Sequence, residues 1–402
     1  MLPATTDVLI VGAGPVGLAT AAALTGAGVD VTVVDRAATA AHTSRAAVVH
    51  AHTLEVLDRI GAADPLAAAG IPAPRFTIRD RDRTLVPISF VDLPTRFPYA
   101  LMVPQSTTEA VLHDRLVAAG GRVLRGYEAV GLSGGTVTFA NGESVTARYV
   151  VAADGMHSTI RELAGIRFGD PSSGGESFTL ADVKVDGGPP RDEVVLYFSG
   201  AGLLVWAPLP DGTVRLVAAV DDAPEHPDTA YVQSLLDHRG PARSPAQVAE
   251  VVWGSRFRVH HRVADTFRAG PVLLAGDAGH VHSPAGGQGM NLGLKDGLAL
   301  ADALTETLRS GSEAPLDRYA AERRPVAQAV VGFASQLTRL ATVPAPLRPV
   351  RNALLSTLAR IPAFRRRLAY RLSGLDQRRA GPAVAGESQH GIERTGHRAS
   401  GT

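Results

Sequence analysis

The sequence predicts an α/β fold with three parts: a parallel-sheet domain assembled from separated segments, an inserted antiparallel-sheet domain, and C-terminal helices. Short apolar runs typical of buried parallel strands lie far apart in the chain, at residues 8–11, 29–34, 149–153 and 271–275. Between the last two runs the pattern changes to strand-like segments with a Pro-Asp-Gly turn at 210–212. Leucines at helical spacing, separated by arginines, follow residue 339.

Composition limits the possible functions. The 402 residues are enough for two domains with separate cores, and a net charge of +1 gives no reason to expect a nucleic-acid partner. The absence of cysteine excludes disulfides, thiolate metal sites, iron–sulfur clusters and a Cys-x-x-Cys redox pair. Neither a signal peptide nor a membrane-spanning apolar stretch is recognisable. We therefore expect a cytoplasmic monomer or homodimer.

A glycine motif follows the first predicted strand. Gly12, Gly14 and Gly17 have the spacing G-x-G-x-x-G, in which the first glycine permits a tight turn, the second admits a pyrophosphate and the third allows close helix packing. The helix expected at 18–27 would direct its N-terminal N–H groups at the phosphates. Asp35 ends the next strand, where an acid binds ribose hydroxyls. This order of elements predicts a dinucleotide-binding site.

A second glycine-rich segment follows the last buried strand. Asp277, after Gly276, would lie at the carboxyl end of a parallel strand, where ligands bind in open α/β sheets and where its carboxylate could accept hydrogen bonds from ribitol. Three glycines then precede a helix predicted at 290–308: Gly286, Gly287 and Gly289. The helix N-terminus would stabilise negative charge on a reduced flavin ring. Together the two motifs indicate FAD and redox chemistry.

Local patterns predict further elements between these motifs. They are a helix at 54–60, a mainly irregular segment at 75–98 with a strand-like piece at 76–79, a helix opened by a capping box at 106–109 and ending near 119, a hairpin around Asn141-Gly142, and strands at 179–185, 193–198, 203–207 and 213–220.

These elements define provisional domain boundaries. The parallel-sheet domain comprises 1–75, 99–177 and 266–338, the inserted domain comprises 76–98 and 178–265, and helices follow at 339–380. We expect 381–402 to be disordered because they are rich in glycine, serine and histidine. For the arginine-rich helices, the simplest interpretation is that they cover the body of the protein; a membrane-surface or partner-binding helix is the alternative.

Several further motifs occur in a recognisable order. They are Ser44-Arg45-Ala46, His52-Thr53-Leu54-Glu55, Gln105 with Thr108-Glu109, Asp154-Gly155 within 150–158, Gly276-Asp277, and Glu322-Arg323-Arg324-Pro325. Over residues 5–340 the chain thereby resembles the class A flavoprotein monooxygenases, the para-hydroxybenzoate hydroxylase-like group, and within it the aromatic polyketide hydroxylases. Many relatives continue into a thioredoxin-like domain, for which this chain stops too soon.

The resemblance implies roles for individual residues. The pyrophosphate would be held by residues 12–17, which include Pro15 and Val16, and the adenosine ribose by Asp35, a shorter acid than the family's usual glutamate, with Arg36 as a further cofactor contact. The remaining implied FAD contacts are Arg45, Gln105, Asp154, Gly155, Gly276, Asp277, Pro284, Gly286, Gly287, Gly289, Met290 and Asn291. Arg45 and Pro284 are candidates for the flavin face, but no catalytic residue is assigned.

The resemblance also implies a reaction. NADPH or NADH would bind transiently and reduce FAD, O₂ would form a flavin C4a-hydroperoxide, and a phenolic or polycyclic, polyketide-like aromatic would be hydroxylated. Epoxidation, ring modification, geranylgeranyl-type reduction and flavin binding without catalysis stay open as alternatives. Three aromatic residues could line a substrate pocket or belong to the core: Tyr197, Phe198 and Trp206. No metal is expected at the histidines of 260–261, 280 and 282.

Overall fold

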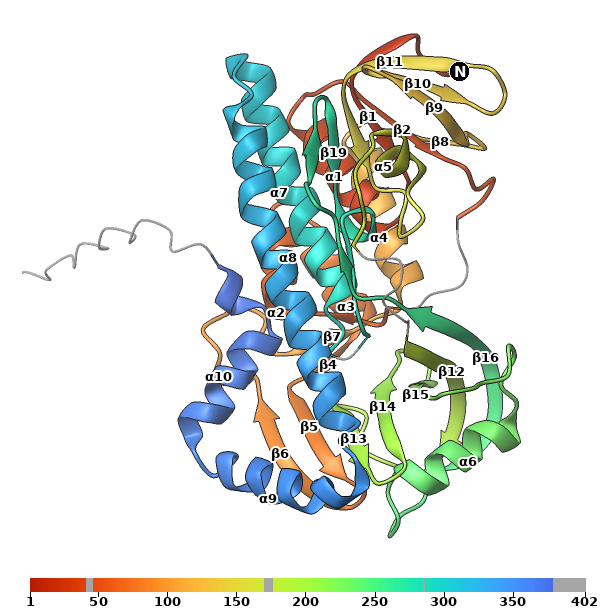
Figure 1. Ribbon diagram of the computed structural model, residues 1–402, viewed down its shortest axis with the longest axis vertical. Helices are drawn as coiled ribbons and strands as arrows, with labels where there is room; N and C mark the ends of the chain where they lie inside the picture. Colours follow the sequence, from red (N-terminus) through yellow and green to blue (C-terminus); the bar gives the residue numbers. More distant parts are fainter. Residues whose placement is uncertain (41–45, 170–175, 285, 379–402) are drawn as a thin grey trace, which may run out of the picture.

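Two large sheets organise the computed structural model, which describes residues 1–40, 46–169, 176–284 and 286–378. One sheet lies in the upper half of Figure 1 and the other in the lower half, and the long helices α7 (Gly289–Ser310) and α8 (Ala314–Ala341) run beside them. Arg45 and the tail expected to be disordered lie outside the described residues. No helix within these ranges is long and apolar enough to cross a membrane.

The first sheet has eight strands and a parallel centre. In spatial order the main path is β18 (Arg268–Ala269), β19 (Val272–Leu274), β11 (Ser144–Ala152), β1 (Thr5–Val11), β2 (Val31–Asp35) and β8 (Val123–Arg125), with β10 (Thr136–Phe139) and β9 (Ala129–Ser133) continuing from β11. Ile10 of β1 lies between Val33 and Val151 in register. The predicted buried strands are confirmed, and the strand after Asn141-Gly142 continues without a break into the predicted strand at 149–153.

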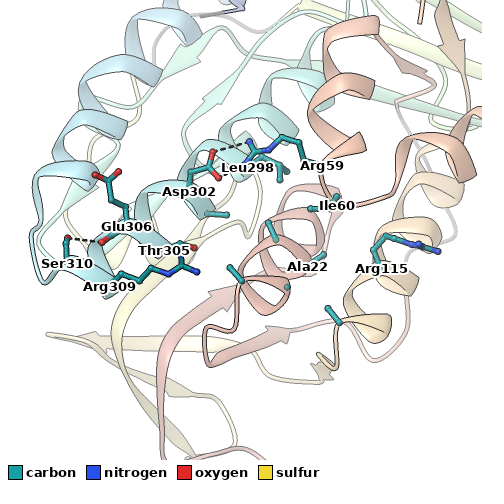
Figure 2. Close-up of a pocket in the computed structure, with 15 residues that line it drawn as sticks. Ala22, Arg59, Ile60, Arg115, Leu298, Asp302, Thr305, Glu306, Arg309 and Ser310 are labelled. Atoms are coloured by element: carbon teal, nitrogen blue, oxygen red, sulfur yellow. Dashed lines mark hydrogen bonds and ion pairs between the residues drawn. The ribbon is translucent and has the colours of Figure 1, made fainter. Parts of the chain in front are cut away.

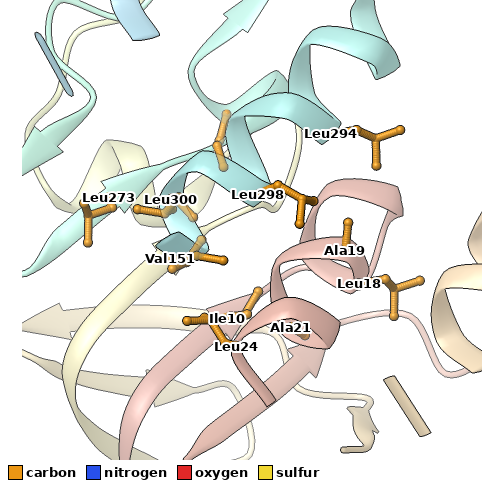
Figure 3. Close-up of a cluster of buried hydrophobic side chains, with 14 of the residues drawn as sticks. Ile10, Leu18, Ala19, Ala21, Leu24, Val151, Leu273, Leu294, Leu298 and Leu300 are labelled. Atoms are coloured by element: carbon orange, nitrogen blue, oxygen red, sulfur yellow. The ribbon is translucent and has the colours of Figure 1, made fainter. Parts of the chain in front are cut away.

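Helix α1 (Pro15–Gly26) packs on this sheet between α7 and α4 (Gln105–Ala118). Figure 3 shows Leu18 and Leu24 of α1 in one cluster with Ile10 of β1 and Leu298 of α7. The capping box predicted at 106–109 is wrong, because α4 begins at Gln105 and no side chain caps it. Two shorter helices, α2 (Ala51–Asp58) and α3 (Ala63–Ala69), lie near α7 and α4.

The second sheet has seven strands. Their order is β16 (Gln247–Val259), β12 (Glu176–Asp186), β15 (Val214–Ala219), β14 (Gly202–Pro208), β13 (Glu193–Ser199), β5 (Arg75–Asp80) and β6 (Arg83–Ser89). The expectation that 75–98 is mainly irregular is wrong, because β5 and β6 form a hairpin and β5 pairs in parallel with β13. Every other pairing in this sheet is antiparallel.

Apart from the C-terminal helices, the remaining described elements are short. They are the three-stranded sheet β3 (Val48–Val49), β7 (Ala100–Met102) and β4 (Ile71–Ala73), the pair β17 (Arg262–Val263) and β20 (His280–Val281), the helices α5 (Thr159–Leu163) and α6 (Thr229–Arg239), and the 3₁₀ turns η1 (Gly276–Ala278), η2 (Ala345–Leu347) and η3 (Leu375–Gln377). The β3–β7–β4 sheet joins 48–49 to the strand that precedes α4.

The two faces of the seven-stranded sheet bury different aromatic side chains. Tyr197 and Trp206 pack with Val232 and Leu236 beneath α6. Phe198, adjacent to Tyr197 in the strand, faces the opposite way and lies in the core shared with α8, α9 (Arg348–Leu358) and α10 (Pro362–Leu372). Of the two alternatives stated for these three aromatic residues, a substrate pocket or the core, the core is confirmed for all three.

The C-terminal helices α9 (Arg348–Leu358) and α10 (Pro362–Leu372) cover β6, and α9 lies across one end of the molecule in Figure 1. Leu355 of α9, together with Ala369 and Leu372 of α10, is buried in the core of the seven-stranded sheet. The interpretation that the arginine-rich helices cover the body is confirmed. Helix α8 was not predicted, and it continues through Pro325.

Arg351 provides a test of this packing. Arg351 is 4% exposed, and its guanidinium donates to the carbonyls of Phe198, Leu340 and Ala341, at 2.7, 3.1 and 3.1 Å. We expect Arg351→Met to leave these carbonyls unpaired and to lower the free energy of unfolding in urea by about 2–4 kcal/mol. Arg360→Met, at an exposed position of the same region, is the control. Equal losses in both variants would contradict this assignment.

Candidate active site

One cavity of about 770 Å³ lies between the two sheets. The predicted site residues that line it are Gly12, Gly14, Pro15, Val16, Asp35, Arg36, Gln105, Asp154, Gly155, Asp277, Pro284, Gly286, Gly287, Gly289 and Met290. Gly17, Gly276 and Asn291 lie behind the lining, and Arg45 is outside the described residues. Segments from distant parts of the chain thus surround a single space, although their contacts with FAD stay predictions.

The three N-terminal glycines differ in what surrounds them. Gly12 has φ +107°, and a Cβ there would lie 2.3 Å from the carbonyl oxygen of Ala153. A Cβ on Gly17 would lie 1.9 Å from the Gly12 carbonyl oxygen. Gly14, in contrast, has no atom within 4 Å of its Cβ position and borders the cavity. The first and third glycines are therefore required by backbone packing, whereas the second leaves open space at the start of α1.

Asp35 is held rigidly at the end of β2. Its Oδ2 accepts a hydrogen bond from the Ala13 N–H at 2.7 Å, and its Oδ1 accepts one from the Ala37 N–H at 2.8 Å. Each carboxylate oxygen keeps a second lone pair for a further donor. The side chain therefore connects the glycine loop to the strand end and could still accept hydrogen bonds from ribose hydroxyls.

Asp154 has a structural role as well as a place in the cavity wall. Its carboxylate accepts hydrogen bonds from the Ser158 hydroxyl at 2.5 Å and from the Ile160 N–H at 3.2 Å, at the start of α5. Burial raises the pKa of Asp154 despite these bonds. Arg161 of α5, which the sequence analysis missed, donates to the carbonyl of Ala278 at 3.1 Å. It thereby fixes the Asp154-Gly155 motif to the turn that carries Asp277.

The loop before α7 is fixed by side-chain amides. Asn291 accepts a hydrogen bond from the His50 N–H at 2.7 Å and donates to the carbonyls of Val48 and Gly287, at 2.8 and 2.7 Å. Gln288 donates to the Leu372 carbonyl at 3.0 Å, so the last turn of α10 supports the same loop. Asn291 therefore supports the cavity wall from behind and does not itself line the cavity.

A buried charge cluster lies behind this loop. His280 Nε2 and Arg323 Nε each lie 2.6 Å from a different oxygen of the fully buried Asp296. Burial alone would raise the pKa of Asp296, but the charges of Arg323 and His280 lower it. This pairing gives a role to Arg323 of the Glu322-Arg323-Arg324-Pro325 motif, which had no role assigned from the sequence. His280 is thereby committed to a carboxylate of α7.

The seven-stranded sheet supplies an apolar wall to the same cavity. The side chains on this wall are Phe76, Val194, Leu196, Val205, Ala207, Val217, Trp253, Phe257 and Val259. Arg215 interrupts the wall, but its guanidinium already has partners. It pairs with Asp182 through two contacts of 2.7 Å and donates to the Ala46 carbonyl at 3.1 Å. The aromatic residues of this wall are thus Phe76, Trp253 and Phe257, and Tyr127 lines another part of the cavity.

A second pocket, of about 850 Å³, lies elsewhere, between α1, α4 and α7 (Figure 2). Five of its fifteen lining residues are alanine, and its charged groups include an exposed pair between Arg59 and Asp302 at 2.5 Å. Ser310 donates to the Glu306 carbonyl at its edge. None of the predicted site residues borders this pocket. We therefore assign the active site to the cavity between the sheets.

The histidines around the site give a pH prediction. Burial, with a smaller contribution from the Lys295 charge, lowers the pKa of His50 to about 4. Between pH 6.5 and 4 the unfolded chain binds a proton that the folded chain does not, so the free energy of unfolding falls as the pH falls through this window. We expect His50 to contribute up to about 3 kcal/mol of that loss. His50→Gln should flatten the profile measured by urea unfolding.

The matched control for this prediction is His113→Gln, on α4, where the histidine side chain is 44% exposed. The pKa values of His52 and His282 are also lowered to about 4, so the His50 variant should reduce the slope without abolishing it. Parallel profiles for the wild type and both variants would show that His50 takes up its proton equally well in the folded protein.

Comparison with known proteins gives the family. A family model described as "FAD binding domain" matches residues 5–334. The 6-methylpretetramide 4-monooxygenase of Streptomyces rimosus is 39% identical over 383 residues, covering 91% of this chain and 68% of that protein.

Two solved structures have the same fold. The anhydrotetracycline hydroxylase of S. rimosus superimposes with a TM-score of 0.76 at 34% identity, covering 95% of this chain and 78% of that one. The p-nitrophenol 4-monooxygenase of Pseudomonas putida gives a TM-score of 0.81 at 26% identity, covering 94% of this chain and 100% of that one. The chain therefore belongs to the FAD binding domain family and, within it, to the FAD-dependent class A aromatic monooxygenases.

Proposed function

We propose that this chain uses NADPH or NADH and O₂ to hydroxylate a phenolic or polycyclic aromatic compound of the polyketide type. One observation carries the proposal. The dinucleotide motifs line one side of the cavity between the sheets, and the apolar wall of the second sheet lines the other side. A flavin ring and an aromatic ring could meet there without an intervening protein layer. The proposal includes a cytoplasmic location, a monomeric or homodimeric state, and the domain boundaries given above.

The residues present fit FAD. The open space at Gly14, next to the N-terminus of α1, suits a pyrophosphate, because helix N–H groups and the positive end of the dipole favour anions. Asp35 would accept hydrogen bonds from the adenosine ribose, and Asp277 would serve the ribitol. Pro284 and Met290 would border the ring system. When bound, FAD supplies the redox chemistry: it accepts hydride from the nicotinamide and delivers electrons to O₂.

The protein's own groups would prepare the site for this chemistry. The N-terminus of α7, at Gly289, borders the cavity and would stabilise negative charge on the reduced ring. The apolar wall, with Phe257 and Val217, would exclude water and accept the flat faces of an aromatic substrate. Arg215 would hold this wall against the segment at 46–49 through the Ala46 carbonyl.

The names of relatives support the substrate class. The three relatives described above are named for 6-methylpretetramide, anhydrotetracycline and p-nitrophenol, so their substrates include both fused-ring and single-ring compounds. A cavity of about 770 Å³ that must also hold the flavin suits a rigid planar substrate better than a large flexible one. Epoxidation or another ring modification uses the same site and would be distinguished by the product.

The test is turnover with anhydrotetracycline as the probe. The purified protein should show a bound-flavin spectrum, and the probe should accelerate NADPH oxidation in air. Mass spectrometry should find a product heavier by one oxygen, and ¹⁸O₂ should label that oxygen. Reduction of the substrate that persists without O₂ would instead indicate a reductase. A colourless protein that cannot be reconstituted with FAD would refute the proposal.

Gly14→Ala tests the FAD fit separately from turnover. Because the Cβ position of Gly14 is empty, we expect the apoprotein to keep its free energy of unfolding to within about 0.5 kcal/mol. The added methyl group would enter the space suited to the pyrophosphate and weaken FAD binding by about tenfold or more. Fluorescence titration of the apoprotein measures the Kd.

Gly26→Ala is the matched control, because its Cβ position is also empty and it lies at the far end of α1, outside the active-site cavity. It should leave both the stability and the FAD affinity unchanged. An unchanged Kd for the Gly14 variant would place the pyrophosphate elsewhere.

A further inference from the structure

His282 lies in the cavity wall, on the loop between β20 and α7. It follows β20, precedes Pro284, and lines the cavity together with Gly289, the first residue of α7. Its ring edge points toward that helix, since Cε1 and Nε2 each lie 3.9 Å from the position that a Cβ on Gly289 would take. Nε2 is shielded from solvent and has no hydrogen-bond partner. The mechanism above gives this side chain no role.

The hydrogen bonding of His282 fixes its tautomer. Nδ1 lies 2.8 Å from the carbonyl oxygen of Ser283, which can only accept, so Nδ1 carries the hydrogen. Burial lowers the pKa of His282 to about 4, with smaller contributions from His280 and His261, so the ring is neutral near pH 7. In a neutral ring with hydrogen on Nδ1, Nε2 is an acceptor with a free lone pair.

Neighbouring polar groups do not serve this acceptor. His280 is bound to Asp296, and His261 Nδ1 lies 3.0 Å from the Ser335 hydroxyl. Among the described residues, none donates to His282 Nε2. A buried acceptor without a donor is unfavourable, so a ligand that brings a donor to this position binds more tightly than one that does not.

We propose that Nε2 of His282 accepts a hydrogen bond from a ring hydroxyl of the aromatic substrate and so selects hydroxylated rings. This inference rests on the proposed function. The facing apolar side chains, such as Phe257 and Val217, have no hydrogen-bond acceptor, and the Arg215 guanidinium can only donate. His282 therefore offers the substrate hydroxyl an acceptor that these residues do not. The accepted hydrogen bond also moves electron density into the ring, toward the carbons ortho and para to the hydroxyl.

His282 is a positioning residue in this proposal and not a base. A neutral imidazole with so low a proton affinity would not remove the proton of a phenol, whose pKa lies near 10 as in tyrosine. The hydroxyl therefore keeps its proton and donates it to Nε2 as a hydrogen bond. No covalent or proton-transfer step is required of His282.

Two variants separate Nε2 from the rest of the ring. His282→Asn keeps a side-chain amide able to donate to the Ser283 carbonyl but has no atom at the position of Nε2. His282→Gln extends an amide oxygen to that position. The probes are 2-naphthol and 2-methoxynaphthalene, which share a fused ring and differ in the hydroxyl hydrogen. Their Kd values are measured on the FAD-loaded protein from the change in the flavin spectrum.

The quantity compared is the ratio of the methoxynaphthalene Kd to the naphthol Kd. We expect this ratio to be about tenfold in the wild type, to persist in the glutamine variant, and to fall to about one in the asparagine variant, with FAD content and melting temperature alike in all three. A ratio in the asparagine variant equal to that of the wild type would overturn the proposal.

A changed flavin spectrum or flavin potential in the ligand-free asparagine variant, with the ratio intact, would assign Nε2 to the flavin and would also overturn it. These outcomes are distinct from failure of the proposed function. That failure would appear in the wild type itself, as absent FAD or as NADPH oxidation that never yields an oxygenated product.

Discussion

Close backbone contact at the carboxyl ends of three parallel strands is the constraint on which the rest of the structure depends. Gly12 at the end of β1 lies against the backbone of Ala153 at the end of β11. Gly276, after β19, lies against the side chain of Val16 of α1. A Cβ at either glycine would approach within 2.3 and 2.8 Å of these neighbours. Residues separated by more than 250 positions therefore meet at one edge, and the cavity begins there.

Helix α7 extends this constraint toward the flavin loop. Gly293 and Gly297 bring α7 against α1, because a Cβ on either would lie 2.7 Å from Val16 or 2.5 Å from Thr20. The same helix carries Asp296, whose buried charge is tolerated because Arg323 and His280 both pair with it. Close packing and ion pairing thus fix α7 at two successive turns, which holds the orientation of its N-terminus at the cavity.

Sequence patterns predicted those parts of the site that depend on local geometry. The glycine spacing of 12–17 and the Gly276-Asp277 turn require particular backbone conformations, so the residue types reveal them. The hairpin β5–β6 was missed because its partner, β13, is more than 100 residues away and because arginines obscure its alternation. Arg161 was missed for a related reason, because its partners are backbone carbonyls, which no side-chain pattern discloses. Arg215 was missed because its partner Asp182 lies opposite it on a neighbouring strand.

The arginine-rich C-terminal helices illustrate how far the site extends beyond its motifs. Gln288 of the flavin loop donates to the Leu372 carbonyl, and the buried Lys295 of α7 donates to Gln377 at 2.5 Å. Burial lowers the pKa of Lys295 to about 7. Both the protonated and the neutral amine can donate a hydrogen bond to Gln377 of η3. Arg378 also pairs with Glu55 of α2. The loop that would border the flavin is therefore held in place by a segment that carries no flavin motif of its own.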